Sequence, residues 1–159
     1  VEEGALVLQE AVDDLDAGMR ELAQLAAGIH PRVLRRGGLA AALADLVGRS
    51  ALRVDLEVRV PERLDEAVEV AAYFVVSEAL TNTLKHAAGA ASARVLVARC
   101  GDELQVVVAD DGCGGADIRD GSGLRGLSDR VQALGGVFSV GSARGAGTTL
   151  TAVLPARPR

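Results

Sequence analysis

The segment 1–30 carries apolar side chains at steps of four and three. These positions are Leu8, Val12, Leu15, Met19, Leu22, Ala26 and Ile29. Glu, Asp, Gln and Arg stand between them. The heptad pattern predicts an amphipathic helix that either pairs with another helix or packs on its own domain. Pro31 is expected to end this helix, because the residue before a proline avoids the helical region.

A strictly alternating run lies further along the chain. Apolar and charged residues take turns there, with the apolar set at Leu52, Val54, Leu56, Val58 and Val60. A period of two predicts a strand with one buried face and one solvated face, and Pro61 is expected to close it. A sheet with one wet face is mostly antiparallel and gathers its helices on the other face. The run therefore favours an α+β two-layer sandwich.

Turn signals divide the rest of the chain into three more helices and four more strands. Gly37-Gly38 predicts a break before the first of these helices, Gly101-Asp102 a tight turn, and Gly135-Gly136 a helix cap. The helices are expected at Leu39–Val47, Asp65–Ala87 and Ser122–Leu134, and the strands at Ala93–Arg99, Leu104–Ala109, Val137–Val140 and Thr148–Leu154.

Composition excludes several classes of protein. The 159 residues are 49% apolar and 25% charged, which excludes a disordered chain. Aromatic residues make up 2%, so the core must be built from Ala, Val and Leu. The formal net charge of −5 argues against non-specific binding of nucleic acid, which needs Lys and Arg to neutralise phosphates.

The cysteines and the apolar runs bear on the cellular setting. Cys100 and Cys113 form no CxxC pair, so neither a disulfide framework nor a zinc site is expected, and reduced thiols fit a cytosolic setting. No apolar run approaches the roughly 18 residues of a membrane span, and no signal peptide is present. Because the sequence begins at Val1 rather than Met, we expect it to be part of a longer protein.

The helix expected at 65–87 carries a polar stripe. Its members, spaced to share one face, are Glu78, Asn82, Lys85 and His86. An apolar stripe is expected opposite, formed by Tyr73, Val76, Leu80, Leu84 and Ala87. A carboxylate, an amide and two basic groups can hold a hydrated Mg²⁺ and a polyphosphate. The alternative is the solvated side of an ordinary surface helix.

Three glycine-rich runs follow the polar stripe. Residues 110–115 (DDGCGG) come directly after a strand, residues 121–126 (GSGLRG) open a helix, and residues 145–148 (GAGT) lead into the last strand. Glycines let the backbone turn sharply and let a ligand approach closely, and a helix N-terminus binds anions. The second run lacks the GK[ST] of a P-loop and the strand of a dinucleotide fingerprint. Each run alone is equally compatible with a polar turn.

The polar stripe and the three glycine runs, in this order, resemble the ATP-binding domain shared by histidine kinases, type II topoisomerases, Hsp90 chaperones and MutL, the GHKL or Bergerat fold. They match the N box and the three glycine boxes of that family. The chain is most similar to bacterial sensor histidine kinases of the nitrate-sensor-like subfamily, on the runs AGIHP (27–31), NTLKHA (82–87) and GLRGLSDR (123–130). The resemblance extends from about residue 22 to residue 155.

The resemblance implies a phosphate side and its residues. Asn82 would bind Mg²⁺, and Glu78 would order water or help to remove a proton. Lys85 and His86 would contact phosphate. The phosphate-side loop and the helix that follows it would contribute Gly121, Gly123, Leu124 and Gly126.

An adenine side is implied in the same way. Asp110 would accept a hydrogen bond from the adenine amino group, in a pocket shaped by Gly112 and Gly114. The wall that closes this pocket would consist of Gly147, Thr148 and Thr149.

The resemblance also implies a domain organisation and partners. Residues 1–30 would be a remnant of the dimerisation hairpin, residues 31–155 the catalytic domain, and residues 156–159 a frayed tail. The domain would bind Mg-ATP and align its γ-phosphate with a histidine of a homodimeric parent, which passes the group to a response regulator. It would work in the cytoplasm, without contact to nucleic acid or membrane, and the parent could be an inner-membrane sensor.

The phosphoacceptor departs from the family pattern. In the family it is a histidine in an H-D or H-E run, on a helix before the one that opens this chain. His30 precedes Pro31 and His86 belongs to the polar stripe, so neither fits. The chain is therefore expected to bind ATP without phosphorylating itself. Two alternatives stay open: an anti-sigma-factor serine kinase with the same fold, and a degenerate interaction module that has lost the nucleotide.

Overall fold

The computed structural model describes residues 32–86, 89, 92–117 and 122–157. Five strands form one sheet in the order β1-β2-β3-β5-β4. Their bounds are Arg53–Arg59 (β1), Ser92–Cys100 (β2), Glu103–Asp110 (β3), Val137–Gly141 (β4) and Thr149–Pro155 (β5). β1 runs parallel to β2, and the other neighbours are antiparallel. The helical arm expected at 1–30 lies outside the described residues.

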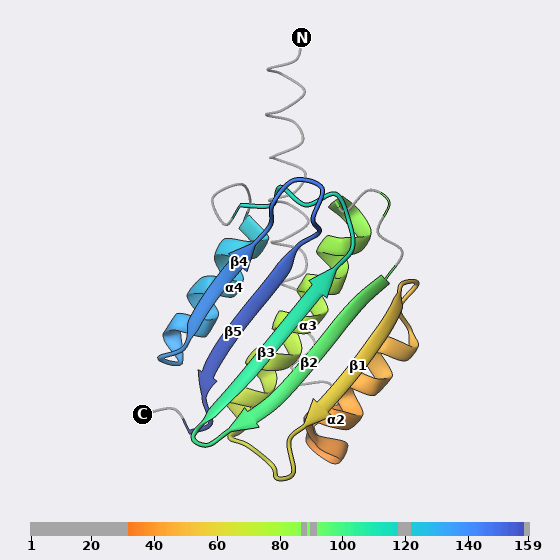
Figure 1. Ribbon diagram of the computed structural model, residues 1–159. Coiled ribbons are helices and arrows are strands. Elements are labelled where there is room, and N and C mark those ends of the chain that lie inside the picture. Colours follow the sequence, from red (N-terminus) through yellow and green to blue (C-terminus); the bar gives the residue numbers. More distant parts are fainter. Residues whose placement is uncertain (1–31, 87–88, 90–91, 118–121, 158–159) are drawn as a thin grey trace.

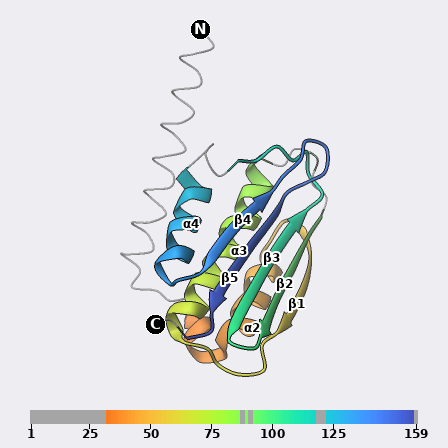
Figure 2. The same cartoon turned by 60° about the vertical axis from the view of Figure 1, so that its left-hand side comes forward.

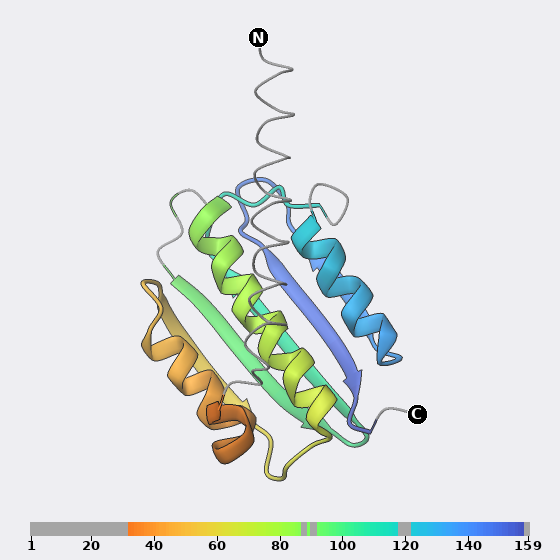
Figure 3. The same ribbon diagram turned by 180° about the vertical axis from the view of Figure 1, so that it is seen from behind.

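In the described part of the chain, three helices cover one face of this sheet. They are α2 (Arg32–Gly48), α3 (Glu66–His86) and α4 (Ser122–Ala133). Figure 1 looks onto the open face of the sheet, and Figure 3 shows the three helices across the opposite face with α3 in the middle. Figure 2 shows the two layers from the side. The expected two-layer α+β sandwich is confirmed. None of the described helices is both long and apolar enough to span a bilayer.

The core between the two layers is almost entirely aliphatic, as the composition predicts. Val68 and Val75 of α3 and Val97 and Val106 of the sheet are fully buried. Burying one such side chain is worth roughly 1.5–3 kcal/mol. Phe138 supplies the one aromatic ring among the described residues of the buried core. Along β1, half-buried and exposed positions alternate from end to end, which confirms the predicted half-buried strand.

The start of α2 differs from the expected element. The glycine pair predicts a helix that begins at Leu39, but helical structure already begins at Arg32. Gly38 interrupts it with φ 73° and ψ −176°, a conformation that favours glycine, so two helices meet at a kink. The break is therefore predicted correctly and the helix before it is missed, because the run 32–37 is too short to display a helical period.

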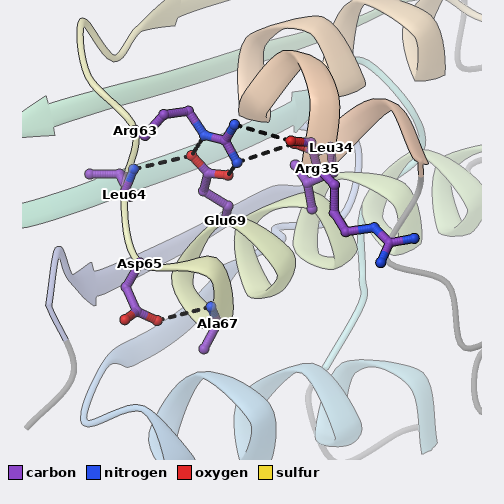
Figure 4. A network of polar contacts seen from close by, with 7 residues as sticks. All are labelled: Leu34, Arg35, Arg63, Leu64, Asp65, Ala67 and Glu69. Carbon is purple, nitrogen blue, oxygen red and sulfur yellow. Dashed lines mark hydrogen bonds and ion pairs between the residues drawn. The ribbon is translucent and has the colours of Figure 1, made fainter.

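A half-buried ion pair joins the β1–α3 connection to α3 (Figure 4). The guanidinium of Arg63 donates from Nε to Oε1 of Glu69 and from Nη2 to Oε2, both at 2.9 Å. The Glu69 side chain is 2% exposed, whereas that of Arg63 is 55% exposed. The backbone N–H of Leu64 also donates to Glu69, at 3.1 Å. The buried carboxylate thus has hydrogen-bond donors on both oxygens.

The same guanidinium holds the end of the short helix before the kink. Arg63 donates to the backbone carbonyl of Leu34 at 3.3 Å and to that of Arg35 at 3.4 Å. These carbonyls precede Gly38, where the helical hydrogen-bond pattern is interrupted. The hydrogen bond to Glu69, together with the charge of that carboxylate, raises the pKa of the Arg63 guanidinium. Arg63 therefore stays charged while it joins α2 to α3.

The apolar stripe predicted for α3 is only partly correct. Val76 and Leu80 are buried and Tyr73 is half-buried, but Leu84 is 53% exposed. Ala87 lies outside the described residues. The buried position in the last turn is instead Thr83, which is 4% exposed. A helical period identifies which residues share a face, but it does not show how far along the helix that face is covered.

Candidate functional site

Asp110, the last residue of β3, is held from three parts of the chain. Its Oδ1 accepts from the backbone N–H of Gly112 at 2.9 Å and from that of Thr148 at 3.2 Å. Its Oδ2 lies 3.2 Å from the hydroxyl oxygen of Thr83 on α3. The side chain is half-buried. Because a carboxylate offers about four acceptor positions, these contacts fix its orientation and leave it able to accept from a ligand.

The loops after β3 and before β5 approach each other so closely that two positions require glycine. Gly114 has φ 65° and Gly147 has φ 73°. A β-carbon on Gly114 would overlap the backbone carbonyl oxygens of Ala143 and Gly147. A β-carbon on Gly147 would overlap the backbone carbonyl oxygen of Asp110. The first and third glycine runs are thus two sides of one structure built around Asp110.

Backbone hydrogen bonds lock these two loops together. Gly145 N–H donates to the carbonyl of Cys113 at 2.7 Å, and Gly115 N–H donates to that of Ser142 at 3.1 Å. The Ser142 hydroxyl accepts from Ala116 N–H at 3.0 Å and lies 2.8 Å from the hydroxyl of Thr148. These bonds tie the two loops into one structure beside the carboxylate of Asp110.

The first turn of α4 lies against the polar stripe of α3. A β-carbon on Gly123 would stand 3.2 Å from Oε1 of Glu78 and 4.0 Å from Oδ1 of Asn82. Both oxygens therefore face the N-terminal turn of α4, whose backbone N–H groups have no partners within the helix. Such a turn attracts anions. Further along, the guanidinium of Arg130 on α4 lies 4.9 Å from the ring centre of Phe74 on α3, which holds the two helices together.

The other predicted site residues lie in different surroundings. Gly112 is buried beside Asp110, Lys85 is exposed, and Leu124 is half-buried against the core. A β-carbon on Gly126 would meet nothing within 4 Å, so packing within the chain does not require glycine there. The remaining three are Thr149, which is exposed at the start of β5, His86, which ends α3, and Gly121, which lies outside the described residues.

The oxygens at Gly123 suit one kind of metal. Within the part of the chain that the structure describes, no group of three or more His, Cys, Asp and Glu could hold a metal ion by itself. Mg²⁺ keeps several waters and takes one or two protein oxygens together with phosphate oxygens. The oxygens of Glu78 and Asn82, beside the N-terminal turn of α4, are of the type that a Mg²⁺ ion arriving with a polyphosphate would need.

Two residues of the site were missed by sequence reasoning. Thr83 contacts Asp110 from α3, and Ser142 joins the two glycine loops. Both stand next to predicted motifs: Thr83 directly follows Asn82, and Ser142 begins the connection that contains the third glycine run. Hydroxyl side chains are common in any sequence, so only the tertiary structure shows which partners these two have.

The chain resembles known proteins over most of its length. Residues 67–158 match the family described as histidine kinase-, DNA gyrase B-, and HSP90-like ATPase. Sensor histidine kinase MctS of Rhizobium johnstonii is 32% identical over 166 residues, and the signal transduction histidine-protein kinase/phosphatase UhpB of Salmonella typhimurium is 34% identical over 163 residues. These alignments cover 98% and 97% of the chain but 36% and 31% of the relatives, so the chain spans about a third of their length.

The chain also resembles a solved structure of a histidine kinase. The blue-light activated histidine kinase of Erythrobacter litoralis matches with a TM-score of 0.60 and 28% sequence identity. The match covers 75% of the chain and 40% of that protein.

Proposed function

The chain belongs to the family of histidine kinase-, DNA gyrase B- and HSP90-like ATPases, and from that premise we propose that it is the catalytic ATP-binding domain of a sensor histidine kinase. Its function would be to bind Mg-ATP and to present the γ-phosphate to a histidine outside this chain. The names of the relatives favour this function over a serine kinase that acts on an anti-sigma pathway.

One observation carries the proposal: neighbouring residues of α3 reach two different groups of the site. Thr83 contacts Asp110, which lies among the glycine loops. Asn82, one residue earlier, faces the first turn of α4 together with Glu78. A base-recognising carboxylate and an anion-binding helix turn are thereby joined through two adjacent positions. This is the arrangement that a nucleotide needs, with its base at one place and its phosphates at the other.

At the base end, the chain supplies shape and one acceptor. The half-buried carboxylate of Asp110 would accept from the amino group at C6 of adenine. Gly114 and Gly147 let the two loops meet beside it without side chains between them. The backbone N–H groups of Gly112 and Thr148 fix the carboxylate. A carboxylate would repel the carbonyl that guanine carries at the same position, so adenine is favoured.

At the phosphate end, the chain supplies oxygens and backbone N–H groups. Asn82 would be the protein ligand to Mg²⁺, and Glu78 would orient a water molecule or accept a proton beside it. When bound, Mg²⁺ neutralises the charge that develops on the phosphates. Lys85 and His86 would contact phosphate. Gly121, together with the first turn of α4 that contains Gly123 and Leu124, would receive the phosphate oxygens. Positioning dominates phosphoryl transfer, so these residues act by holding rather than by covalent chemistry.

The phosphoacceptor and the later partners would come from elsewhere in a longer protein. Neither His30 nor His86 lies in an H-D or H-E run. Residues 1–30 would form part of a dimerisation hairpin, residues 31–155 the catalytic domain, and 156–159 a tail. The parent would be a homodimer that works on the cytoplasmic side and passes its phosphoryl group to a response regulator.

Calorimetric titration of the chain tests the proposal. We expect ADP to bind in the micromolar range, more tightly with Mg²⁺ than without, and GDP to bind weakly. Asn82→Ala should lower the affinity for ADP with Mg²⁺ to the value without Mg²⁺, because it removes the amide oxygen, while the circular dichroism spectrum stays unchanged. Thr81→Ala is the control and should bind as the wild type does, because the Thr81 hydroxyl donates to the carbonyl of Ser77, one turn earlier on the same helix. If the folded chain binds no nucleotide, the proposal is wrong and a degenerate module is favoured.

A further inference from the structure

Thr83 is a polar residue in an apolar place. It is 4% exposed, and the other described polar side chains of the buried interior are Glu69 and Ser128. Its hydroxyl oxygen lies 3.0 Å from the carbonyl of Ala79, one helical turn earlier, and 3.2 Å from Oδ2 of Asp110. A buried hydroxyl needs a hydrogen-bond partner, and a valine of nearly the same shape would need none.

The hydroxyl has one proton and two acceptors within reach. The carbonyl of Ala79 already accepts from the backbone N–H of Thr83 in a regular helix. A carboxylate is the stronger acceptor, because a hydrogen bond to a charged group is worth more than one to a neutral group. If the proton pointed to Ala79, a lone pair of the hydroxyl would face the negative oxygen of Asp110. The arrangement therefore favours donation to Asp110.

The other described donors to Asp110 contact Oδ1, the carboxylate oxygen that Thr83 does not reach. The backbone N–H groups of Gly112 and Thr148 both donate to Oδ1. Among the described residues, Thr83 is the hydrogen-bond partner of Oδ2. With Oδ1 occupied twice, Oδ2 is the oxygen with an acceptor position left for a ligand. The direction of that position depends on Thr83.

We propose that Thr83 is a positioning residue for base recognition: its hydroxyl fixes Oδ2 of Asp110 so that the carboxylate accepts from a C6 amino group and repels a C6 carbonyl. This inference rests on the proposed function, since it deepens the role of Asp110. Thr83 itself touches the carboxylate and not the base. Loss of the hydroxyl should therefore change the discrimination between bases more than it changes the fold.

The chain contains a matched control on the same helix. Thr81 makes the same bond to the preceding turn, with its hydroxyl 2.9 Å from the carbonyl of Ser77, and it has no hydrogen bond to Asp110. Thr83→Val and Thr81→Val remove the same chemical group two residues apart. A purely structural role of the hydroxyl predicts similar effects of the two changes on nucleotide discrimination, whereas a positioning role predicts an effect at Thr83 alone.

The experiment compares ADP with inosine diphosphate, which has a carbonyl in place of the amino group. Both are titrated with Mg²⁺ into the wild type, Thr83→Val, Thr83→Ser and Thr81→Val, and the ratio of the two affinities is measured. We expect Thr83→Val to lower the preference for ADP by about fivefold, the effect of one ordinary hydrogen bond. Thr83→Ser, which keeps the hydroxyl, should retain the preference, and Thr81→Val should not change it.

The outcomes separate this inference from the proposed function. If the wild type prefers ADP and Thr83→Val keeps the full preference, or Thr81→Val lowers it equally, the inference is wrong and the proposed function stands. If the wild type binds neither nucleotide, both are wrong. If it binds the two equally, the inference and the base-recognising role of Asp110 are wrong, while nucleotide binding itself stands. Should Thr83→Val lose its cooperative thermal transition, Thr83→Cys takes its place. A thiol has similar size and is a weak donor, so it is also expected to lower the preference.

Discussion

At the scale of single residues, the site depends on positions where no side chain fits. Gly114 and Gly147 both have positive φ, and a β-carbon on either would overlap backbone atoms of the opposite loop. The sequence marks these glycines as candidates because they stand in short glycine runs. It does not distinguish them from Gly126, where a β-carbon would meet nothing within 4 Å. The difference arises because the loops after β3 and before β5 interlock.

Gly114→Ala should therefore separate the two loops. We expect a lower midpoint of thermal unfolding, with at least about 1 kcal/mol lost to the positive φ alone. Affinity for ADP should also fall, because the backbone around Asp110 must shift. Calorimetry and thermal unfolding measure both effects.

Gly48→Ala is the control for this change. Gly48 lies at the end of α2, and a β-carbon there would meet nothing within 4 Å. Its stability should stay within about 0.5 kcal/mol of the wild type. If Gly114→Ala is as stable as Gly48→Ala, the interpretation of the glycine loops is wrong.

At the scale of elements, the connection between β1 and α3 joins α2 to α3, two helices that are separated along the chain by β1. Arg63 pairs with the buried carboxylate of Glu69 and caps the carbonyls of Leu34 and Arg35. The sequence predicts none of these contacts, since Arg63 and Glu69 look like ordinary charged residues near a helix start. Burial of Glu69 gives the pair its importance, because a buried charge without a partner is strongly destabilising.

Arg63→Gln should lower the midpoint of thermal unfolding more than Arg59→Gln does. Arg59 pairs with Glu57 on the exposed face of β1, where the loss of an ion pair costs little. A basic group whose pKa is raised on folding stabilises the folded state at every pH below its ordinary pKa, and the stabilisation is lost only as the pH rises above it. The difference between the two variants should therefore persist across neutral pH.

A second substitution tests the cause. In the Arg63→Gln background, Glu69→Gln removes the buried charge and should restore part of the lost stability. If the two changes add independently, the buried carboxylate is not the reason for the loss.

At the scale of the whole molecule, the site forms at one end of the sandwich from four separate parts of the chain. α3 supplies residues 78–83, the end of β3 and its loop supply 110–114, α4 supplies its first turn, and the loop before β5 supplies 142–148. Figure 3 shows α3 between α2 and α4, which allows its last turns to reach both the sheet and α4. In the proposed function this site binds and positions a nucleotide, whereas neither His30 nor His86 stands in the H-D or H-E run of a phosphoacceptor.

The chain incubated with radiolabelled ATP and Mg²⁺ should therefore remain unlabelled. The expected result is no acid-labile, base-stable phosphate on the protein after electrophoresis. Parallel calorimetry checks that the same preparation binds ADP. A missing label then cannot be explained by misfolding. Label on His30 would contradict this prediction and would place the phosphoacceptor inside the chain.

Local patterns in the sequence determine the elements of this protein and the identity of its motifs. The alternation in β1, the glycine cap after α4 and the order of the four motifs all follow from residues near one another in the chain. The cap, for example, is seen in Gly135 at φ 77° and in the bond from Gly136 N–H to the carbonyl of Val131. Such features depend on backbone sterics and on the side-chain period, which a sequence contains directly.

Only the tertiary structure decided which elements are neighbours and therefore which polar groups meet. The sequence does not show that β1 pairs in parallel with β2 or that β5 lies between β3 and β4. The antiparallel pairing of β5 with β3 brings Thr148 beside Asp110. Thr83 and Ser142 gained their partners in the same way, and Leu84 stayed exposed because the apolar face of α3 is not covered to its end. Packing between distant segments sets these contacts, and a local period in the sequence contains no information about distance across the fold.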